Sequence, residues 1–186
     1  HFEIVSDQTM NFRTTQYGRV NYEDPNYNIQ LPIFGIHGNH DDPTREGAGA
    51  GTTEALSAMD LLSVSNLVNY IGKSSSVDRV DLLPVLMTKG ETKIALYGLG
   101  SIRDERLNRL FTKSAVNFVR PVIPEGEEGD WFSIFTLHQN RGERGRGAKN
   151  CVHEAMIPSF MDYVVWGHEH ECIKSSEESV TGQFHV

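Results

Sequence analysis

The sequence of 186 residues carries a formal net charge of −8, with 38% apolar and 23% charged side chains. This length suits one domain with its own hydrophobic core, and no apolar run approaches the roughly 20 residues that cross a bilayer. The negative balance argues against holding nucleic acid by bulk positive charge, so such a substrate would need local contacts or metal ions. Cys151 and Cys172 lack CxxC spacing, which predicts reduced thiols and disfavours a zinc knuckle or a thioredoxin-type motif.

Short apolar strands interspersed with amphipathic helices predict an α/β domain. In chain order, the pattern predicts strands at 31–36, 67–71, 80–87, 94–99, 116–119, 131–137 and 163–166, and helices at 55–64, 102–111 and 154–160. A hairpin turn at 89–92 would join the third strand to the fourth. Segment 20–28 is rich in turn formers, tyrosine and asparagine, which predicts a surface loop or, alternatively, a partner-binding loop. Segment 44–51 has the glycine and alanine content of a flexible linker.

The predicted helix 55–64 is apolar over more than one face. An ordinary core helix is the favoured interpretation. The alternative is a helix that packs on the sheet and also meets a partner helix.

Positive charge gathers in two segments. The loop 141–149 has four positive charges against one negative, and we expect Arg144 and Arg146 to contact phosphate. The arginines of the predicted helix 102–111 are expected to form a solvated face.

Three predicted strands run directly into loops that open on imidazole. The strand 31–36 leads to Asn39, the strand 131–137 ends at His138, and the strand 163–166 ends just before His168 and His170. Loops at the carboxyl ends of strands hold the ligands in open α/β sheets. A single histidine after a strand is usually structural, but three such events favour convergence on one site.

The donors in these loops are imidazole and amide groups, with no thiolate. This set suits manganese, iron or zinc in an open catalytic site and disfavours a structural zinc. His168 and His170 are two residues apart, so extended backbone would place both rings on one side, within reach of two neighbouring metals. Gly38 and Gly167 would let the backbone approach the site closely. Two metal ions would polarise a phosphodiester and activate a water for attack on it.

The remaining polar residues of the first loop suggest proton transfer. His40 is expected to hydrogen-bond a phosphate oxygen or to protonate the leaving group. Asp41 would orient His40, and the alternative role for Asp41 is capping of a turn or helix. For Asp42, capping is the favoured role. His37 is expected in the core, with a supporting role behind the ligands as the alternative, and His153 is expected on the surface.

The motifs resemble those of calcineurin-like metallophosphoesterases, in the same order: Gly38-Asn39-His40-Asp41, Leu137-His138-Gln139-Asn140 and Gly167-His168-Glu169-His170. The strings GNHDDPT, YGLGSIRDERL, LHQNR and VVWGHEHEC are similar to the eukaryotic meiotic-recombination-eleven nucleases of double-strand-break repair. The bacterial SbcD nuclease is a more distant relative. The resemblance covers essentially the whole chain.

This resemblance implies a two-layered β-sandwich flanked by helices, and manganese-dependent 3′-to-5′ exonuclease and single-strand endonuclease activity. Asn39, His138 and His168 would ligate the second metal and His170 the first, with His40, oriented by Asp41, as the catalytic acid. The resemblance also implies action on DNA ends in the nucleus, homologous recombination and meiosis. Family members form homodimers, partly through the helix that matches residues 55–65. They assemble with a coiled-coil SMC-like ATPase and with a Nibrin-type subunit, which the loop 20–28 would meet.

The sequence also departs from the family pattern. The Asp-x-His motif and the Gly-Asp motif that supply most ligands of the first metal are absent, and Gly129-Asp130 is in the wrong order to replace the latter. We therefore expect residues 1–186 to be a partial metallophosphoesterase domain, truncated at both ends, without the capping domain and the ATPase-binding tail. Weak or no activity is expected of it alone. A non-catalytic scaffold for DNA ends and partners is the alternative, and a protein phosphatase is a less favoured one.

Overall fold

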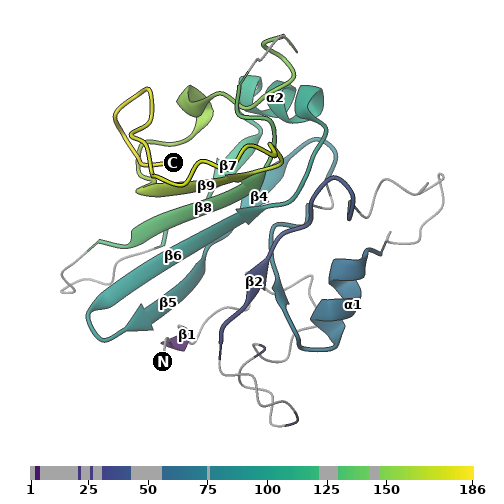
Figure 1. The fold of residues 1–186 in the computed structure, drawn as a ribbon, viewed down its shortest axis with the longest axis vertical. Coiled ribbons are helices and arrows are strands. Elements are labelled where there is room, and N and C mark those ends of the chain that lie inside the picture. Colours follow the sequence, from purple (N-terminus) through teal and green to yellow (C-terminus); the bar gives the residue numbers. More distant parts are fainter. Residues whose placement is uncertain are drawn as a thin grey trace.

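The computed structural model describes residues 3–4, 21, 26, 31–42, 56–74, 76–121, 130–142 and 147–186. A five-stranded mixed sheet, in the order β1-β5-β6-β8-β9, runs through the centre of these residues (Figure 1). Its strands are β1 (Glu3–Ile4), β5 (Val85–Lys89), β6 (Thr92–Leu99), β8 (Phe132–His138) and β9 (Tyr163–Gly167). The first three are antiparallel neighbours, whereas β6, β8 and β9 run parallel. The carboxyl ends of the parallel strands therefore meet at one edge of the sheet.

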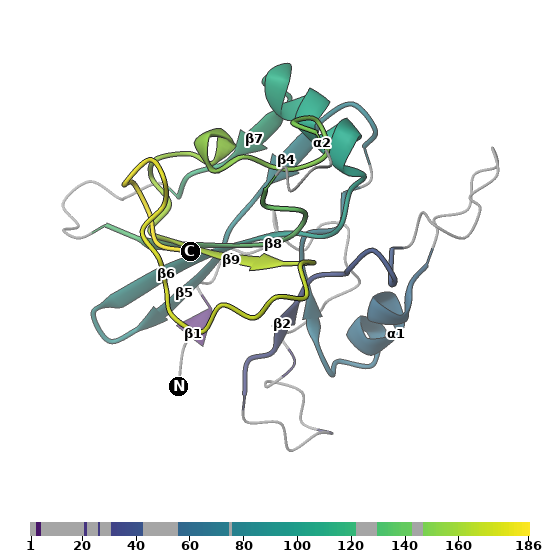
Figure 2. The ribbon, with the colours of Figure 1, turned by 45° about the horizontal axis from the view of Figure 1, so that its top comes forward.

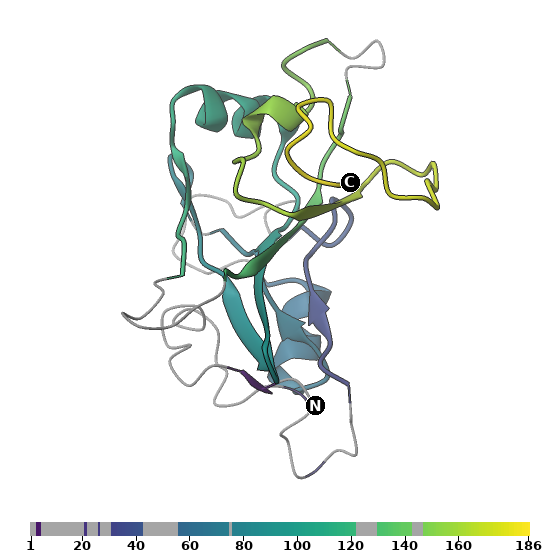
Figure 3. The ribbon, with the colours of Figure 1, turned by 90° about the vertical axis from the view of Figure 1, so that its left-hand side faces the viewer.

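Two smaller parallel pairs cover this sheet. One pair is β4 (Val80–Leu82) with β7 (Val116–Phe118), and the other is β2 (Phe34–Gly35) with β3 (Asn69–Tyr70). The first pair and helix α2 (Asp104–Thr112) lie on one side of the sheet (Figure 2). Strand β2 and helix α1 (Ala58–Val64) lie on the other side (Figure 3). This layered α/β arrangement confirms the predicted fold class.

The main core lies between the five-stranded sheet and the layer of β4, β7 and α2. Alternate residues of β8 are buried, so Phe135 and Leu137 face this core while Phe132 remains 48% exposed. Phe118 packs against Phe135, Tyr97 and Phe160, and Phe160 also packs against Tyr97. These contacts are tilted or edge-to-face, with ring centroids 5.2–6.3 Å apart. Such contacts stabilise a core beyond the simple burial of area. On β8, His138 consequently points away from this core, toward the layer that contains β2 and β3.

The layer of β2 and β3 is tied to the end of β6 by backbone hydrogen bonds. The Gly100 N–H donates to the Gly72 carbonyl (2.9 Å), and the Ser101 N–H donates to the His37 carbonyl (3.0 Å). The loop that follows β2 is thereby held at the carboxyl edge of the parallel strands.

Several predicted elements differ from the structure. The prediction of a single strand at 80–87 was wrong. This segment is divided between β4 and β5, which belong to different sheets, because Pro84 has no N–H to continue a ladder. The strand at 31–36 is reduced to β2, and the strand at 67–71 to β3. The helix at 154–160 is a single 3-10 turn, Glu154–Met156, because Pro158 follows closely.

The other elements and the hairpin turn were predicted correctly. The linker 44–51, and all of 20–28 except Asn21 and Asn26, lie outside the described residues. No helix in the described part of the chain has both the length and the apolar character needed to cross a membrane.

Replacing Phe135, which is fully buried, with alanine is expected to lower the free energy of unfolding by about 3–5 kcal/mol, because a large cavity remains. Phe132→Ala is the matched control on the same strand, and its cost should stay below about 1 kcal/mol. Urea denaturation followed by circular dichroism measures both. Equal losses in the two variants would contradict the alternation that places Phe135 in the core.

Candidate metal and phosphoester site

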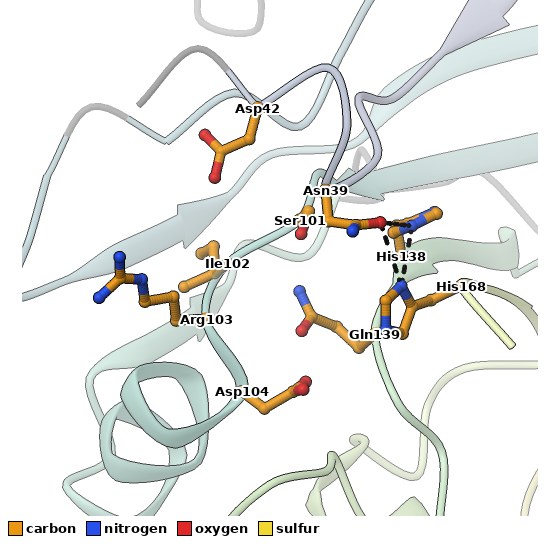
Figure 4. A pocket seen from close by; sticks show the side chains of 9 residues that line it. All are labelled: Asn39, Asp42, Ser101, Ile102, Arg103, Asp104, His138, Gln139 and His168. Atoms are coloured by element: carbon orange, nitrogen blue, oxygen red, sulfur yellow. Dashed lines mark hydrogen bonds between the residues drawn. The ribbon is translucent and has the colours of Figure 1, made fainter. Parts of the chain in front are cut away.

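Three side chains meet at the carboxyl edge of the parallel strands (Figure 4). Asn39 lies in the turn after β2, His138 ends β8, and His168 follows β9. His138 pairs with Gly167 in the register of β8 and β9, so His168 is one residue beyond that pair. Asn39 Oδ1 lies 3.1 Å from His138 Nε2 and 3.2 Å from His168 Nδ1, and these two nitrogens lie 3.2 Å apart. The structure thus brings together three of the four predicted metal ligands.

These three contacts cannot all be hydrogen bonds at once. The amide oxygen of Asn39 only accepts, and each imidazole nitrogen either donates or accepts. Whichever nitrogens carry protons, at least one pair presents two donors or two acceptors to each other. A divalent cation would attract all three lone pairs, and bonds of about 2.0–2.2 Å to it place neighbouring ligand atoms about 2.8–3.6 Å apart, from octahedral to tetrahedral angles. The donor types and their spacing therefore fit one metal ion.

The third donor of this trio is an amide, which is a less common ligand than a carboxylate. Across the described residues, no group of three or more His, Cys, Asp or Glu side chains could hold a metal ion. Asn39 Oδ1 lies within 3.2 Å of both imidazole nitrogens, which makes it the candidate third ligand of a metal bound by His138 and His168.

The backbone around His138 is shaped to receive its ring. A Cβ on Gly38 would lie 3.0 Å from His138 Cε1, and a Cβ on Gly167 would lie 3.2 Å from His138 Nδ1. Both distances are tighter than ordinary contacts, as the sequence predicted for these glycines. His168 adopts a φ of 92°, which is unfavourable for a residue with a side chain and is typical of functional sites.

Burial lowers the pKa of His138 from its ordinary value of 6.5, and the neighbouring His168 and His37 lower this pKa further. The negative charge of Asp41 raises it, but by less. His138 is therefore biased toward the neutral form. Neutral imidazole is the form that binds a metal.

A cavity of about 330 Å³ opens beside the three donors. The segment after β6 forms its far wall, with Ser101, Ile102, Arg103 and Asp104 (Figure 4). Asp42 and Gln139 complete the lining. Sequence reasoning missed this wall, because nothing in the string after β6 indicates which edge of the sheet it faces.

The other predicted site residues lie around this centre. His40 and Asp41 are exposed in the turn that carries Asn39. His170 is exposed as well and is not part of the cavity lining, so the structure does not bring it to the trio. Arg144 and Arg146 lie outside the described residues.

His37 lies in the core, as predicted, and anchors the loop that carries Asn39. It is 4% exposed, and burial lowers its pKa from the ordinary value of 6.5. Its Nδ1 lies 2.7 Å from the hydroxyl oxygen of Tyr70, and its Nε2 lies 3.2 Å from the Ser101 carbonyl oxygen. The position of Asn39, two residues later, thus depends on a buried polar contact to β3.

His153, which was expected on the surface, is half-buried in the structure. Its Nε2 lies 3.0 Å from the Ala148 carbonyl oxygen.

The family of calcineurin-like phosphoesterases matches residues 13–172, and this chain belongs to that family. The chain is also similar to proteins named "Double-strand break repair protein MRE11". It is 52% identical to the Arabidopsis thaliana protein and 46% identical to the Gallus gallus protein over its whole length, and 51% identical to the Homo sapiens protein over 92% of its length. The chain spans about a quarter of the length of these relatives.

Removing the Tyr70 hydroxyl by Tyr70→Phe is expected to destabilise the protein by about 1–3 kcal/mol, since it leaves a buried imidazole nitrogen without its partner. Tyr163→Phe is the control, because Tyr163 is only half-buried and the loss of its hydroxyl should change stability little. Thermal unfolding of both variants gives the comparison. A Tyr70→Phe variant as stable as Tyr163→Phe would show that the contact does not anchor the loop.

Proposed function

We propose that this chain is part of a manganese-dependent DNA nuclease that acts in double-strand-break repair. Membership of a phosphoesterase family supports the hydrolysis of phosphate esters. The names of the relatives support DNA as the substrate. The observation that carries the proposal is the trio of Asn39, His138 and His168, whose donor atoms lie 3.1–3.2 Å apart at the carboxyl edge of the sheet.

In this proposal Asn39, His138 and His168 hold one of two manganese ions, and His170 contributes to the other. When bound, such ions polarise the phosphodiester and make a water nucleophilic at neutral pH. The activities proposed for the whole protein are 3′-to-5′ exonuclease and single-strand endonuclease.

His40 is the proposed catalytic acid. It is exposed next to the Asn39 ligand, where a substrate strand over the cavity can meet its ring. Its imidazolium would donate a proton to the leaving oxygen of the phosphodiester. Asp41 would fix the tautomer and the orientation of His40.

Helix α1 is the proposed homodimer contact. Its only buried residue is the polar Ser63, whereas Leu61 is 67% and Val64 is 62% exposed. This reverses the usual pattern of a surface helix and favours a partner interface over an ordinary core helix. Leu56, two residues before α1, adds further exposed apolar area.

The remaining partners are proposed from the relatives and the sequence. They are a coiled-coil SMC-like ATPase, and a Nibrin-type subunit that meets the loop 20–28. Arg144 and Arg146 are proposed to contact DNA phosphates, and the nucleus is the proposed site of action.

A non-catalytic scaffold that binds DNA ends and partners is the second candidate. The observation that favours it is the donor set, which among the described residues has two imidazoles and an amide but no carboxylate.

Replacing His40 with asparagine in the full-length protein is expected to reduce manganese-dependent cleavage by at least about a hundredfold, since general acid catalysis contributes about 10²–10⁴. DNA binding and dimerisation should be unchanged, because the ring is exposed. His153→Asn is the matched control and should cleave normally. A His40→Asn enzyme with full exonuclease activity would refute the role of His40, and an inactive parent enzyme would favour the scaffold.

Placing a charge on α1 by Leu61→Asp is expected to convert the dimer to a monomer in light scattering, because the carboxylate would be buried without a partner. Val180→Asp is the control, since Val180 is a 92% exposed valine outside α1. A dimer that survives Leu61→Asp would exclude α1 from the interface.

A further inference from the structure

A second cavity, of about 290 Å³, adjoins the one beside the metal-donor trio. The two share Asp42, Ser101, Ile102 and Arg103 in their linings. Beyond this shared wall, the second cavity is lined by His37, Lys73, Ser74 and Arg106. We call the group of Lys73, Ser74, Ser101, Arg103 and Arg106 the basic recess. A ligand in the first cavity can therefore extend into the basic recess.

Three cations and one carboxylate, Asp42, line this second cavity. Lys73 is paired with Asp60 at 2.8 Å. Arg106 donates instead to two neutral groups, the carbonyls of Ser76 (2.8 Å) and Val77 (3.2 Å). These bonds fix the guanidinium in place without neutralising its charge.

Arg103 carries the second positive charge without a counterion. No carboxylate of the described residues pairs with Arg103 or Arg106, and Arg103 is exposed where the two cavities meet. The predicted solvated face of this helix holds for Arg103 and Arg109, which are exposed, but Arg106 is half-buried. Arg103 and Arg106 also line a cavity, which the prediction did not include. In a chain with a net charge of −8, such a local positive recess attracts an anion that the rest of the surface repels.

Gln139 supplies a second indication of a ligand. It is 2% exposed and lines the first cavity, on the side of His138 and Asp104 (Figure 4). Its Nε2 finds no hydrogen-bond partner among the described residues. A buried donor of this kind is normally satisfied by water or by a ligand oxygen. Asp104, the other acid of this cavity, accepts through Oδ2 from Asn140 Nδ2 at 2.6 Å, whereas its Oδ1 has no hydrogen-bond partner among the described residues. Asp104 does not line the basic recess.

We propose that the basic recess binds a backbone phosphate of a single DNA strand, next to the phosphodiester held at the trio. Arg103 and Arg106 supply charge, and Ser74 and Ser101 supply hydroxyl donors. This inference rests on the proposed nuclease function and adds to it a residue, Arg103, that positions the strand. It implies that a substrate with a neighbouring phosphate is held more tightly than an isolated phosphodiester.

The test uses the full-length protein and labelled single-stranded oligonucleotides in which one phosphate at a time is an uncharged methylphosphonate. Fluorescence anisotropy without added metal gives each dissociation constant. For the parent protein, a methylphosphonate at one position is expected to weaken binding about fivefold, which is the effect of losing one exposed charge pair. Arg103→Ala should weaken binding of the unmodified strand by about the same factor. In this variant, a methylphosphonate at the sensitive position should cause no further loss of affinity. Arg109→Ala, an exposed arginine of the same helix that lines neither cavity, should keep the parent pattern.

The proposal is overturned if no position matters, or if Arg103→Ala keeps the full effect of the methylphosphonate. It is also overturned if Arg109→Ala removes the effect as Arg103→Ala does, because bulk charge then explains the result. The scan is read from binding alone. A lack of manganese-dependent cleavage would therefore contradict the proposed nuclease and leave this readout intact.

Discussion

The register between β8 and β9 is the constraint on which the candidate site depends. His138 pairs with Gly167, and the two strands stay in step from Ile134 onward. A slip by one residue would turn Phe135 and Leu137 out of the core and His138 into it. The free energy of core burial thus fixes the orientation of His138. The orientation of this donor thus follows from how β8 packs.

The third donor reaches the site through a different layer. Asn39 belongs to the turn after β2, and β2 has only two residues, too few to hold the turn by its own ladder. The structure compensates with buried polar contacts: His37 bonds to Tyr70 and to Ser101, and its carbonyl accepts from the Ser101 N–H. Since β6 leads into Ser101, the position of Asn39 is set by the same sheet that sets His138. Both donors are therefore positioned by the same sheet, which is what a preorganised site requires.

The sequence allowed the sheet edge and the trio to be predicted because each depends on a local pattern. An apolar run that ends in histidine shows where a strand stops, and parallel strands stop at one edge. The division of 80–87 between two sheets could not be predicted, since the apolar residues continue across Pro84 and only tertiary contacts decide which half pairs with which strand. The same holds for the wall formed by Ser101 and Arg103, which no periodicity assigns to the site.

The exposed position of His170 has a physical explanation in the same terms. His138 and His168 are held by paired strands, but β9 ends at Gly167 and His168 has a left-handed φ of 92°. Beyond such a residue the alternation of an extended segment no longer applies, so a spacing of two residues does not place His168 and His170 on one side. The prediction from spacing assumed that an extended strand continues through His168 and His170, whereas β9 ends at Gly167, one residue before His168.

Helix α1 and the basic recess are connected by one ion pair. Asp60 of α1 accepts from the Ser57 N–H at the start of the helix (2.7 Å) and pairs with Lys73 of the recess (2.8 Å). The carboxylate that caps the proposed dimer helix therefore also draws Lys73 toward α1 and reduces the charge that Lys73 offers to a phosphate. A partner that covers α1 would remove water from this pair and strengthen it. Arg103 and Arg106 lack such a link to α1, so they are the cations whose attraction for a strand is independent of the dimer.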